Sequence, residues 1–332
     1  MSDPRALHAD RPPDGGGGTN PARRRLGRTD LEVFPLNLGG NVFGWTADRD
    51  ATFAVLDAYR EAGGNFIDTA DVYSKWVPGH VGGESEALIG AWLKARGARH
   101  EIVIATKVGL GGPGLDAGLG AEQIRRGCER SLARLGVERL DLFYAHKDDP
   151  ETPLEETLRA FDALIRAGKV RAIGASNYTP QRLREALDVS AKLGLAAYAV
   201  VQPEYNLVTR EQLEGPLATV TLERGLAVCP YYALASGFLT GKHRPGEAAA
   251  GARGPRVQRY LDDPRATARL ETLRAVARER GATPAQVALA WQLHKPFVTA
   301  PIASATSPAQ VRELVASVHL ELDADALRRL DA

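Results

Sequence analysis

The chain has 332 residues, of which 44% are hydrophobic and 25% are charged, proportions typical of a globular protein. Lysine plus arginine (42) nearly balances aspartate plus glutamate (41), and the basic residues form no cluster, so we expect no nucleic-acid partner. The sequence contains no signal peptide and no run of about 20 apolar residues. We therefore expect no membrane insertion and predict a cytoplasmic location.

The two cysteines, Cys128 and Cys229, show no spacing typical of a metal or redox motif. Cys128 shares a helical stripe with apolar residues, and Cys229 follows a short apolar run, so both are predicted to be buried packing residues. This cysteine usage fits a reducing compartment rather than a disulfide framework. We predict no metal site.

Residues 1–22 combine proline, glycine and polar residues with almost nothing apolar to bury, and we expect a disordered N-terminal tail there. Over residues 23–332, short apolar runs of strand type alternate with amphipathic helical segments. The runs lie at 35–39, 65–68, 102–106, 140–146, 170–176, 198–202, 226–230 and 297–301. Eight such runs, most of them followed by a helical segment, predict parallel βαβ units within one domain.

Several helices carry start signals. Thr152-Pro153, Thr179-Pro180, Thr283-Pro284 and Ser307-Pro308 each place a hydroxyl residue for the N-cap before a proline at the first helical position. Residues 240–263 are different, because this Gly-, Ala- and Arg-rich segment is predicted to be a long loop. Loops of that length are usually functional or disordered.

Eight βαβ units can close into a (β/α)8 TIM barrel, with parallel strands inside and helices outside, and its active site lies at the C-terminal ends of the strands. A doubly wound open sheet is the alternative architecture. The dinucleotide-binding form of that sheet would require a G-x-G-x-x-G sequence after the first strand, which this chain lacks. We therefore predict the barrel.

Polar residues stand at the ends of three successive strand runs. Asp68 ends the second run, Lys107 follows the third and His146 follows the fourth. Because successive strands are neighbours in a barrel, these side chains are expected at one mouth. Tyr73 lies five residues beyond Asp68, on the loop that can fold over the same mouth.

A tyrosine among these residues is suited to proton donation. A phenol is a poor acid at neutral pH, but a nearby ammonium such as that of Lys107 favours the phenolate and is expected to lower the pKa of Tyr73. Asp68 would hold Lys107 in place, and His146 could hydrogen-bond a substrate carbonyl. Each residue alone also fits an ordinary structural role, so the hypothesis depends on their joint placement.

The segment GNFIDTADVY, residues 64–73, resembles the aldo-keto reductase signature around the catalytic aspartate and tyrosine. Runs 102–107 and 140–146 are similar to that family's lysine and histidine strands. The resemblance extends from about residue 24 to 320. It implies reversible, NADP(H)-dependent reduction of aldehydes or ketones to alcohols, on small-molecule carbonyl substrates. The implied catalytic residues are Asp68, Tyr73, Lys107 and His146, with Tyr73 as the general acid.

The same resemblance implies a set of cofactor-binding residues: Ser176, Asn177, Gln202, Tyr231, Ala233, Leu234, Ser236, Gly237, Leu239, Lys242, Ser304, Thr306, Gln310 and Glu313. The first four match the nicotinamide site, those from Ala233 to Lys242 the pyrophosphate loop, and the rest the adenosine turn. Tyr232-Ala233 replaces a Ser-Pro pair that is common in the family. We expect NADPH to be preferred by a modest margin, with NADH usable, because Arg312 is the only cation in the first turns of the last segment's helix.

Two other function classes stay open. Barrels of the family that this chain resembles also serve as cofactor-sensing auxiliary subunits of ion channels with little turnover, although no long docking extension is evident here. A metal-dependent barrel hydrolase is disfavoured, because the strand ends offer no His-x-His pair and place a lysine beside the aspartate. Candidate substrate-pocket residues are Trp45, Trp76, Lys147, Asp148 and Asp149. The particular carbonyl substrate and the oligomeric state are not predicted.

Overall fold

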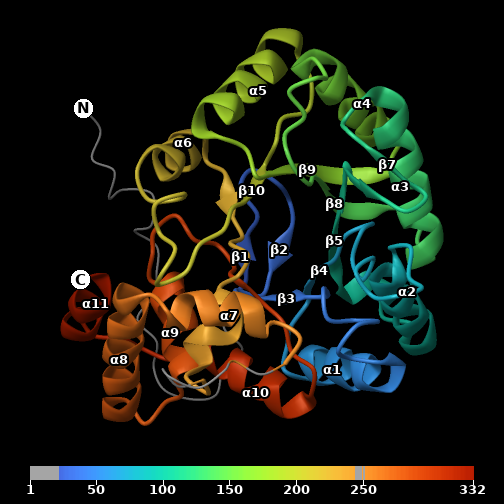
Figure 1. Cartoon of the computed structure of the whole chain (residues 1–332). Helices are drawn as coiled ribbons and strands as arrows, with labels where there is room; N and C mark the ends of the chain where they lie inside the picture. The colour runs from blue at the N-terminus through green and yellow to red at the C-terminus, as the bar shows by residue number, and fades with distance from the viewer. Residues whose placement is uncertain (1–21, 244–248, 250) are drawn as a thin grey trace.

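The computed structural model describes residues 22–243, 249 and 251–332, and its central feature is a curled sheet of eight parallel strands in the order β11-β10-β9-β8-β5-β4-β3-β12 (Figure 1). These strands are β3 (Asn37–Gly39), β4 (Phe66–Asp68), β5 (Val103–Val108), β8 (Leu140–Ala145), β9 (Val170–Ser176), β10 (Val200–Gln202), β11 (Ala227–Val228) and β12 (Ile302–Ala303). The backbone N–H groups of Thr299 and Ile302 donate to the carbonyls of Val228 and Pro230, each at 2.8 Å, and so join the two ends of the sheet. The predicted (β/α)8 TIM barrel is confirmed.

Helices form a ring around this barrel (Figure 1). They are α1 (Arg49–Glu61), α2 (Glu84–Arg96), α3 (Ala121–Leu135), α4 (Leu154–Arg166), α5 (Pro180–Leu193), α6 (Pro216–Arg224), α7 (Gly254–Leu261), α8 (Pro264–Glu279), α9 (Pro284–Leu293), α10 (Pro308–Ala316) and α11 (Ala324–Asp331). Short 3-10 turns occupy η2 (Arg99–Glu101), η3 (Ala235–Thr240) and η4 (Ser317–His319). None of the described helices is both long and apolar enough to cross a membrane.

Seven of the eight predicted strand runs overlap the observed strands, and the eighth is wrong in its position. The run 297–301 comes just before β12 and is not itself a strand. Pro301 has no amide N–H to donate to a neighbouring strand. Pairing with β3 therefore begins only at Ile302, whose partner is Asn37.

Three of the four predicted helix starts are confirmed. The side chains of Thr179, Thr283 and Ser307 each accept a hydrogen bond from the backbone N–H three residues on. The cap predicted at Thr152 is wrong, because α4 begins without a side-chain cap. The Thr152 hydroxyl donates to Asp149 at 2.6 Å instead. The helix nevertheless begins at Leu154, one residue after the predicted first helical position.

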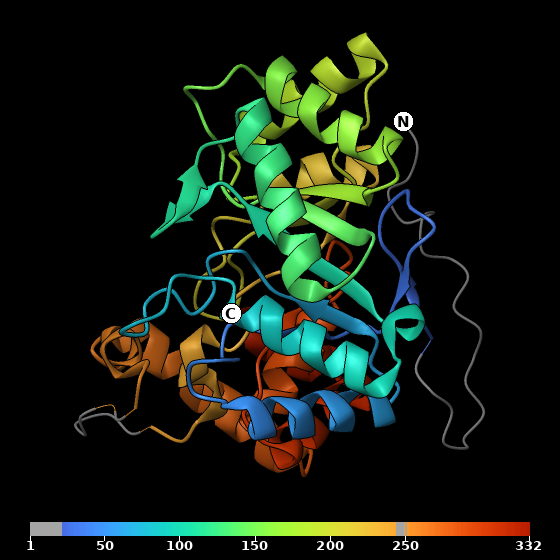
Figure 2. The ribbon, with the colours of Figure 1, turned by 90° about the vertical axis from the view of Figure 1, so that its right-hand side faces the viewer.

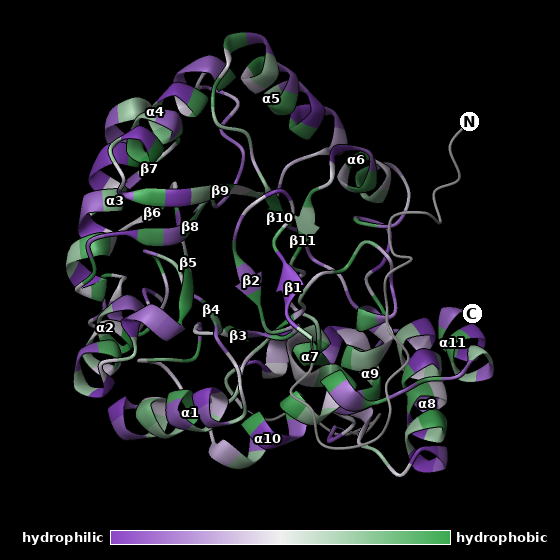
Figure 3. Ribbon diagram, turned by 180° about the vertical axis from the view of Figure 1, so that it is seen from behind, coloured by the Kyte–Doolittle hydropathy of each residue, from purple (hydrophilic) through white to green (hydrophobic). Residues whose placement is uncertain are grey.

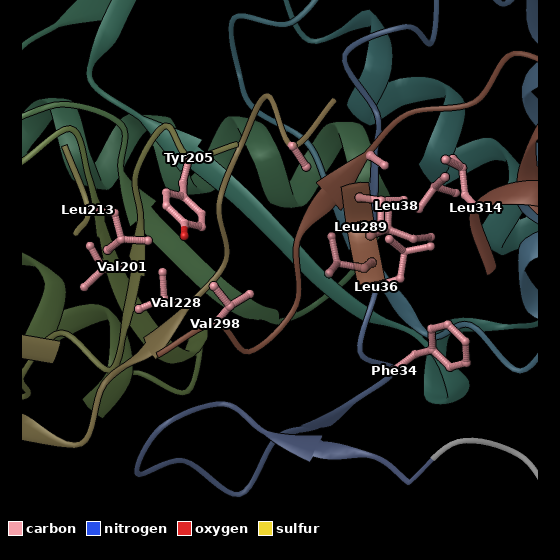
Figure 4. Close-up of a cluster of buried hydrophobic side chains, with 14 of the residues drawn as sticks. Phe34, Leu36, Leu38, Val201, Tyr205, Leu213, Val228, Leu289, Val298 and Leu314 are labelled. Atoms are coloured by element: carbon pink, nitrogen blue, oxygen red, sulfur yellow. The ribbon is translucent and has the colours of Figure 1, made fainter. Parts of the chain in front are cut away.

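Apolar side chains gather in two clusters, one inside the barrel and one between the barrel and the helices. The inner cluster is closed at one end by Leu26, Leu31 and Val33. Figure 4 shows part of the outer cluster, with strand and helix side chains packed together, and Figure 3 shows hydrophilic residues on the outer faces of the helices. Cys128 and Cys229 are both buried, as predicted.

Two short hairpins lie at opposite ends of the barrel (Figure 2). Strands β1 (Arg24–Arg25) and β2 (Glu32–Val33) pair antiparallel at the end that the inner cluster closes. Strands β6 (Leu110–Gly112) and β7 (Leu115–Ala117) follow β5 and so stand at the C-terminal end of the strands. The sequence patterns predict neither hairpin, since strands of two or three residues carry too few positions to show alternation.

The segment 240–263 is not one long loop, because α7 occupies its second half. Val257 and Leu261 are buried on this helix, and their spacing of four residues places them on one face. Residues 244–248 and 250 lie outside the described residues, and so do residues 1–21, which make up nearly all of the predicted tail.

Candidate active site

The C-terminal ends of three neighbouring strands bring together the predicted catalytic residues. Asp68 is the last residue of β4, and His146 follows β8 directly. Lys107 lies one residue before the end of β5 rather than after it, because the strand extends to Val108. Tyr73 comes from the loop after β4 and reaches the same point.

Lys107 is the centre of this group. Its Nζ donates to Asp68 Oδ2 at 2.6 Å, to Tyr73 OH at 2.8 Å and to the carbonyl of Thr69 at 2.7 Å. Tyr73 OH lies 3.2 Å from the same oxygen of Asp68. An ammonium has three N–H donors, so each donor of Lys107 has an acceptor. The phenol is held between a cation and an anion.

The acid–base state of Tyr73 differs from the prediction. Burial, followed by the Asp68 carboxylate, raises the pKa of Tyr73 well above the usual value of a phenol. The expectation that Lys107 lowers this pKa is therefore wrong in its net direction, because burial disfavours the phenolate more than the ammonium favours it. Burial also lowers the pKa of Lys107, although Asp68 opposes that change. Tyr73 thus keeps its proton at neutral pH, which is the form that can donate.

His146 is buried, and its ring centroid lies 6.1 Å from that of Tyr73 in an edge-on arrangement. Burial, followed by the charges of Lys107 and Lys75, lowers the pKa of His146 well below its usual value. The imidazole is therefore neutral at physiological pH. Its Nδ1 is buried and has no hydrogen-bond partner among the described residues.

The four residues matched to the nicotinamide site are linked to each other and to the catalytic group. Asn177 Nδ2 donates to the carbonyl of His146 at 2.9 Å and to Ser176 Oγ at 3.0 Å. Tyr231 OH donates to Asn177 Oδ1 at 2.8 Å. Asn177 has a φ of 56°, a left-handed backbone that asparagine tolerates better than most residues.

Gln202 connects these residues to the carboxylate of Asp68, a predicted catalytic residue. Its Nε2 donates to Asp68 Oδ1 at 2.8 Å, and its own carbonyl accepts from Ser176 Oγ at 2.8 Å. All three residues are buried. The sequence patterns do not predict the bond between Gln202 and Asp68, since it joins β10 to β4 across the barrel.

The segment matched to the pyrophosphate loop is an irregular 3-10 turn. Tyr232, Ala235, Ser236 and Gly237 all have positive φ. A Cβ at Gly237 would meet nothing within 4 Å, so the backbone there faces open space. Ser236 Oγ is buried and has no partner in the described part of the chain. The other matched residues differ in exposure: Ala233 and Leu239 are buried, Leu234 is half-buried and Lys242 is exposed.

The residues matched to the adenosine turn lie between β12 and α10. Ser304 Oγ donates to Asn41 Oδ1 at 2.7 Å. Gln310 folds back, so that its Oε1 accepts from the backbone N–H of Thr306 at 2.8 Å. Glu313 is half-buried, and Arg312 is exposed.

Arg253, just before α7, was not predicted as a site residue. Its guanidinium carbon lies 5.7 Å from the ring centroid of Trp45, and one of its nitrogens is 3.5 Å from Asn41 Oδ1. Asn41 is the partner of Ser304, so a cation stands next to the predicted adenosine turn. Burial lowers the pKa of Arg253, and no carboxylate among the described residues acts on this pKa. The sequence shows several arginines in residues 240–263, but only the fold shows that Arg253 lies beside Asn41.

Two tryptophans line the mouth beside the catalytic group. Trp45 and Trp76 pack edge to face with ring centroids 5.5 Å apart, and Trp76 lies 6.2 Å from Tyr73. Trp76 is 45% exposed, a large value for an indole. The described residues hold no group of three or more His, Cys, Asp or Glu side chains that could bind a metal ion.

The acidic pocket candidates have structural partners instead. The two carboxylate oxygens of Asp148 share a bifurcated hydrogen bond from Arg182 Nε, each at 3.0 Å. Asp149 accepts from the backbone N–H of Leu119 at 2.8 Å and from Thr152. Lys147 is exposed. Both carboxylates therefore stabilise loops, and the aromatic pair is the better candidate for the substrate wall.

Comparisons with known proteins identify the family of this chain. The model of the Aldo/keto reductase family matches residues 35–332. The chain is 33% identical over 306 residues to the "Probable voltage-gated potassium channel subunit beta" of Arabidopsis thaliana, covering 89% of this chain and 90% of that protein. It is 34% identical to the "Uncharacterized oxidoreductase YrpG" of Bacillus subtilis, covering 92% and 94%, and 32% identical to "Protein tas" of Escherichia coli, covering 93% and 96%. The chain belongs to the aldo/keto reductase family.

Proposed function

We propose that this protein is an NAD(P)H-dependent reductase that converts aldehydes or ketones to alcohols in a reversible reaction, with Tyr73 as the proton donor. The observation that carries the proposal is the position of Tyr73 OH, 2.8 Å from the Lys107 ammonium and 3.2 Å from the Asp68 carboxylate at the mouth of the barrel. We assign Asp68, Tyr73, Lys107 and His146 as the catalytic residues.

The proton moves from the Tyr73 hydroxyl to the carbonyl oxygen of the substrate. Charge then develops on the phenolate oxygen, and the Lys107 ammonium already points at that atom from 2.8 Å. Preorganised charge of this kind stabilises a transition state without further rearrangement. Asp68 keeps Lys107 in place at 2.6 Å. A positioned general acid contributes roughly 10²- to 10⁴-fold to a rate.

His146 orients the substrate in this proposal. Its neutral ring lies edge-on to the Tyr73 ring, and a hydrogen bond from the imidazole to the substrate carbonyl would aim that oxygen at the phenol. Trp45 and Trp76 supply the apolar wall on the same side. Lys107 and Asp68 are themselves buried, and the exclusion of water around them strengthens the electrostatic effect of Lys107.

The described residues fit a nicotinamide dinucleotide, which when bound supplies the hydride. The fit rests on the orphaned Ser236 hydroxyl, the open backbone at Gly237 and the Arg253 cation. We assign Ser176, Asn177, Gln202 and Tyr231 to the nicotinamide end and the loop from Ala233 to Lys242 to the pyrophosphate. We assign Ser304, Thr306, Gln310 and Glu313 to the adenosine end. NADPH is the proposed cofactor, with NADH usable.

An auxiliary subunit with little turnover is the second candidate. Three similar proteins carry the name voltage-gated potassium channel subunit beta. The hydrogen bonds among Asp68, Tyr73 and Lys107 favour an enzyme, because a protein that only senses cofactor does not require a proton donor at the mouth. In either case we propose that residues 23–332 act as one domain in the cytoplasm.

A panel of aliphatic, aromatic and sugar-derived aldehydes and ketones tests the proposal, with NADPH and NADH supplied separately and the alcohols assayed in the reverse direction. We expect carbonyl-dependent oxidation of NADPH and a slower reaction with NADH. Tight cofactor binding without turnover of any carbonyl would favour the auxiliary subunit.

A further inference from the structure

Asp71 is a buried carboxyl group that the proposed mechanism does not use. It lies on the loop between Asp68 and Tyr73, and only 2% of its surface is exposed. Its Oδ1 is buried and has no hydrogen-bond partner in the described part of the chain. Its backbone N–H donates to the carbonyl of Lys107 at 3.2 Å, so the loop that carries Asp71 is fixed against β5.

The cations around Asp71 are engaged with other groups. The three donors of Lys107 go to Asp68, Thr69 and Tyr73. Lys75 donates to the carbonyl of Gly111 at 2.5 Å.

Arg134, on α3, donates through Nε to Glu86, on α2, at 2.6 Å, while its buried Nη2 makes no hydrogen bond within the described part of the chain. The other oxygen of Glu86 accepts from Thr106 at 2.5 Å, so this buried carboxylate is also fully engaged. Lys107 contacts the carboxylate of Asp68, and Arg134 contacts that of Glu86. Among the described residues, no cation contacts the carboxyl group of Asp71 directly. A buried carboxyl without a counter-ion strongly favours its neutral form.

The electrostatic consequence is a group that titrates near neutral pH. Burial, followed by repulsion from Glu86, raises the pKa of Asp71 to about 7. Arg134, Lys107 and Lys75 oppose this rise without cancelling it. The coupling works in both directions, because the Asp71 charge raises the pKa of Lys107. The charged and titratable groups that act on Asp71 are thus Lys75 from its own loop, Lys107 from β5, Glu86 from α2 and Arg134 from α3.

We propose that Asp71 is a positioning residue whose protonation state sets how well Lys107 can stabilise the Tyr73 phenolate, so that ionisation of Asp71 slows carbonyl reduction. The proposal rests on the proposed function. Neutral Asp71 leaves the full charge of Lys107 directed at the Tyr73 oxygen. Ionised Asp71 adds a negative charge to the same buried region, which opposes the phenolate that must form as Tyr73 gives up its proton.

The kinetic test compares wild type, Asp71→Asn and Asp71→Glu over about pH 5 to 9, the range around the titration of such a carboxyl. The wild-type rate of reduction at saturating substrate should fall as pH rises through about 7, because Asp71 ionises there. Ionised Asp71 raises the pKa of Tyr73, and each unit of that rise lowers the rate by at most about tenfold. Asp71→Asn should lose this pH dependence and keep the high rate. Asp71→Glu retains a carboxyl and should keep a falling limb. The same limb in Asp71→Asn would overturn the proposal.

Infrared difference spectroscopy supplies a readout that does not depend on turnover. Wild type should show a carboxylic-acid C=O band that disappears as pH rises through about 7 and that is absent in Asp71→Asn. If the band is missing across about pH 5 to 9, Asp71 is ionised throughout and the proposal fails. The infrared band and the Asp71→Glu profile also decide the matter if Asp71→Asn does not fold.

Asp162→Asn is the matched control, since Asp162 is a largely buried aspartate that binds the N–H of Ala196 far from the mouth. Its pH profile should match that of wild type. Absence of turnover in wild type and all variants would overturn the proposed function itself. That failure is distinguishable, because a failure of the Asp71 proposal alone leaves wild-type turnover intact.

Discussion

Gln202, on β10, donates to Asp68 Oδ1 at 2.8 Å. A residue of the proposed nicotinamide site is therefore hydrogen-bonded to the carboxylate that positions Lys107. The other oxygen of Asp68 accepts from Lys107 and lies 3.2 Å from Tyr73 OH. One carboxylate thus receives hydrogen bonds from both halves of the site. A change at Gln202 should disturb cofactor binding and proton transfer together.

The substitution Gln202→Leu tests this link. It leaves Asp68 Oδ1 buried without its hydrogen bond, which costs about 1–3 kcal/mol of free energy. We therefore expect turnover to fall roughly tenfold and cofactor affinity to weaken as well. Stopped-flow kinetics and cofactor titration measure the two effects separately. Gln181→Leu, on the exposed surface of α5, is the matched control and should change neither. Weaker cofactor binding with unchanged turnover would show that the bond to Asp68 has no catalytic consequence.

Arg253 should contribute to cofactor affinity. Its guanidinium lies beside Asn41 and over Trp45, next to the turn that holds Ser304. Arg253→Ala removes a charge-assisted contact, so the Kd for NADPH should rise roughly tenfold or more, and more than the Kd for NADH. Tryptophan fluorescence quenching measures both. Arg265→Ala, at an exposed position on α8, serves as the control. Equal losses for the two cofactors would place Arg253 on a phosphate that they share, and no loss for either would remove it from the site.

Asp71 should also make stability depend on pH. Its pKa rises from about 4 in the unfolded chain to about 7 in the fold, so its contribution is most favourable below about pH 4 and is lost as pH rises through about 7. The loss amounts to at most about 4 kcal/mol, from about 1.4 kcal/mol for each unit of pKa. Urea denaturation at a series of pH values should show wild type losing stability relative to Asp71→Asn over this range. A difference between the two proteins that stays constant with pH would contradict the assigned pKa.

The sequence predicts the barrel, and it predicts that Asp68, Tyr73, Lys107 and His146 lie together at one mouth, because both depend on local patterns. Apolar runs that end in Asp68 and His146 carry their own strand signal. Contacts between distant segments leave no such signal. The bond between Gln202 and Asp68 and the approach of Arg253 to Asn41 span 134 and 212 residues along the chain.

Two further predictions differ from the structure, because the sequence shows neither how deeply a side chain is buried nor which distant residues contact it. Lys107 beside Tyr73 suggested a lowered phenol pKa, but the sequence does not show how completely water is excluded around the hydroxyl, and that exclusion raises the pKa instead. Asp148 and Asp149 looked like pocket residues because they follow His146. Only the fold shows that Asp148 accepts a hydrogen bond from Arg182 and that Asp149 accepts one from Thr152.

In the proposed reaction, Tyr73 donates the proton during carbonyl reduction. Single-turnover oxidation of prebound NADPH by a reactive aldehyde, in wild type and Tyr73→Phe, tests it most directly. Tyr178→Phe, at a buried hydroxyl that pairs with Tyr198 and not with Asp68 or Lys107, is the control and should react like wild type. We expect Tyr73→Phe to bind NADPH normally but to react roughly 10²-fold or more slowly. A Tyr73→Phe variant that reacts at the wild-type rate would contradict it.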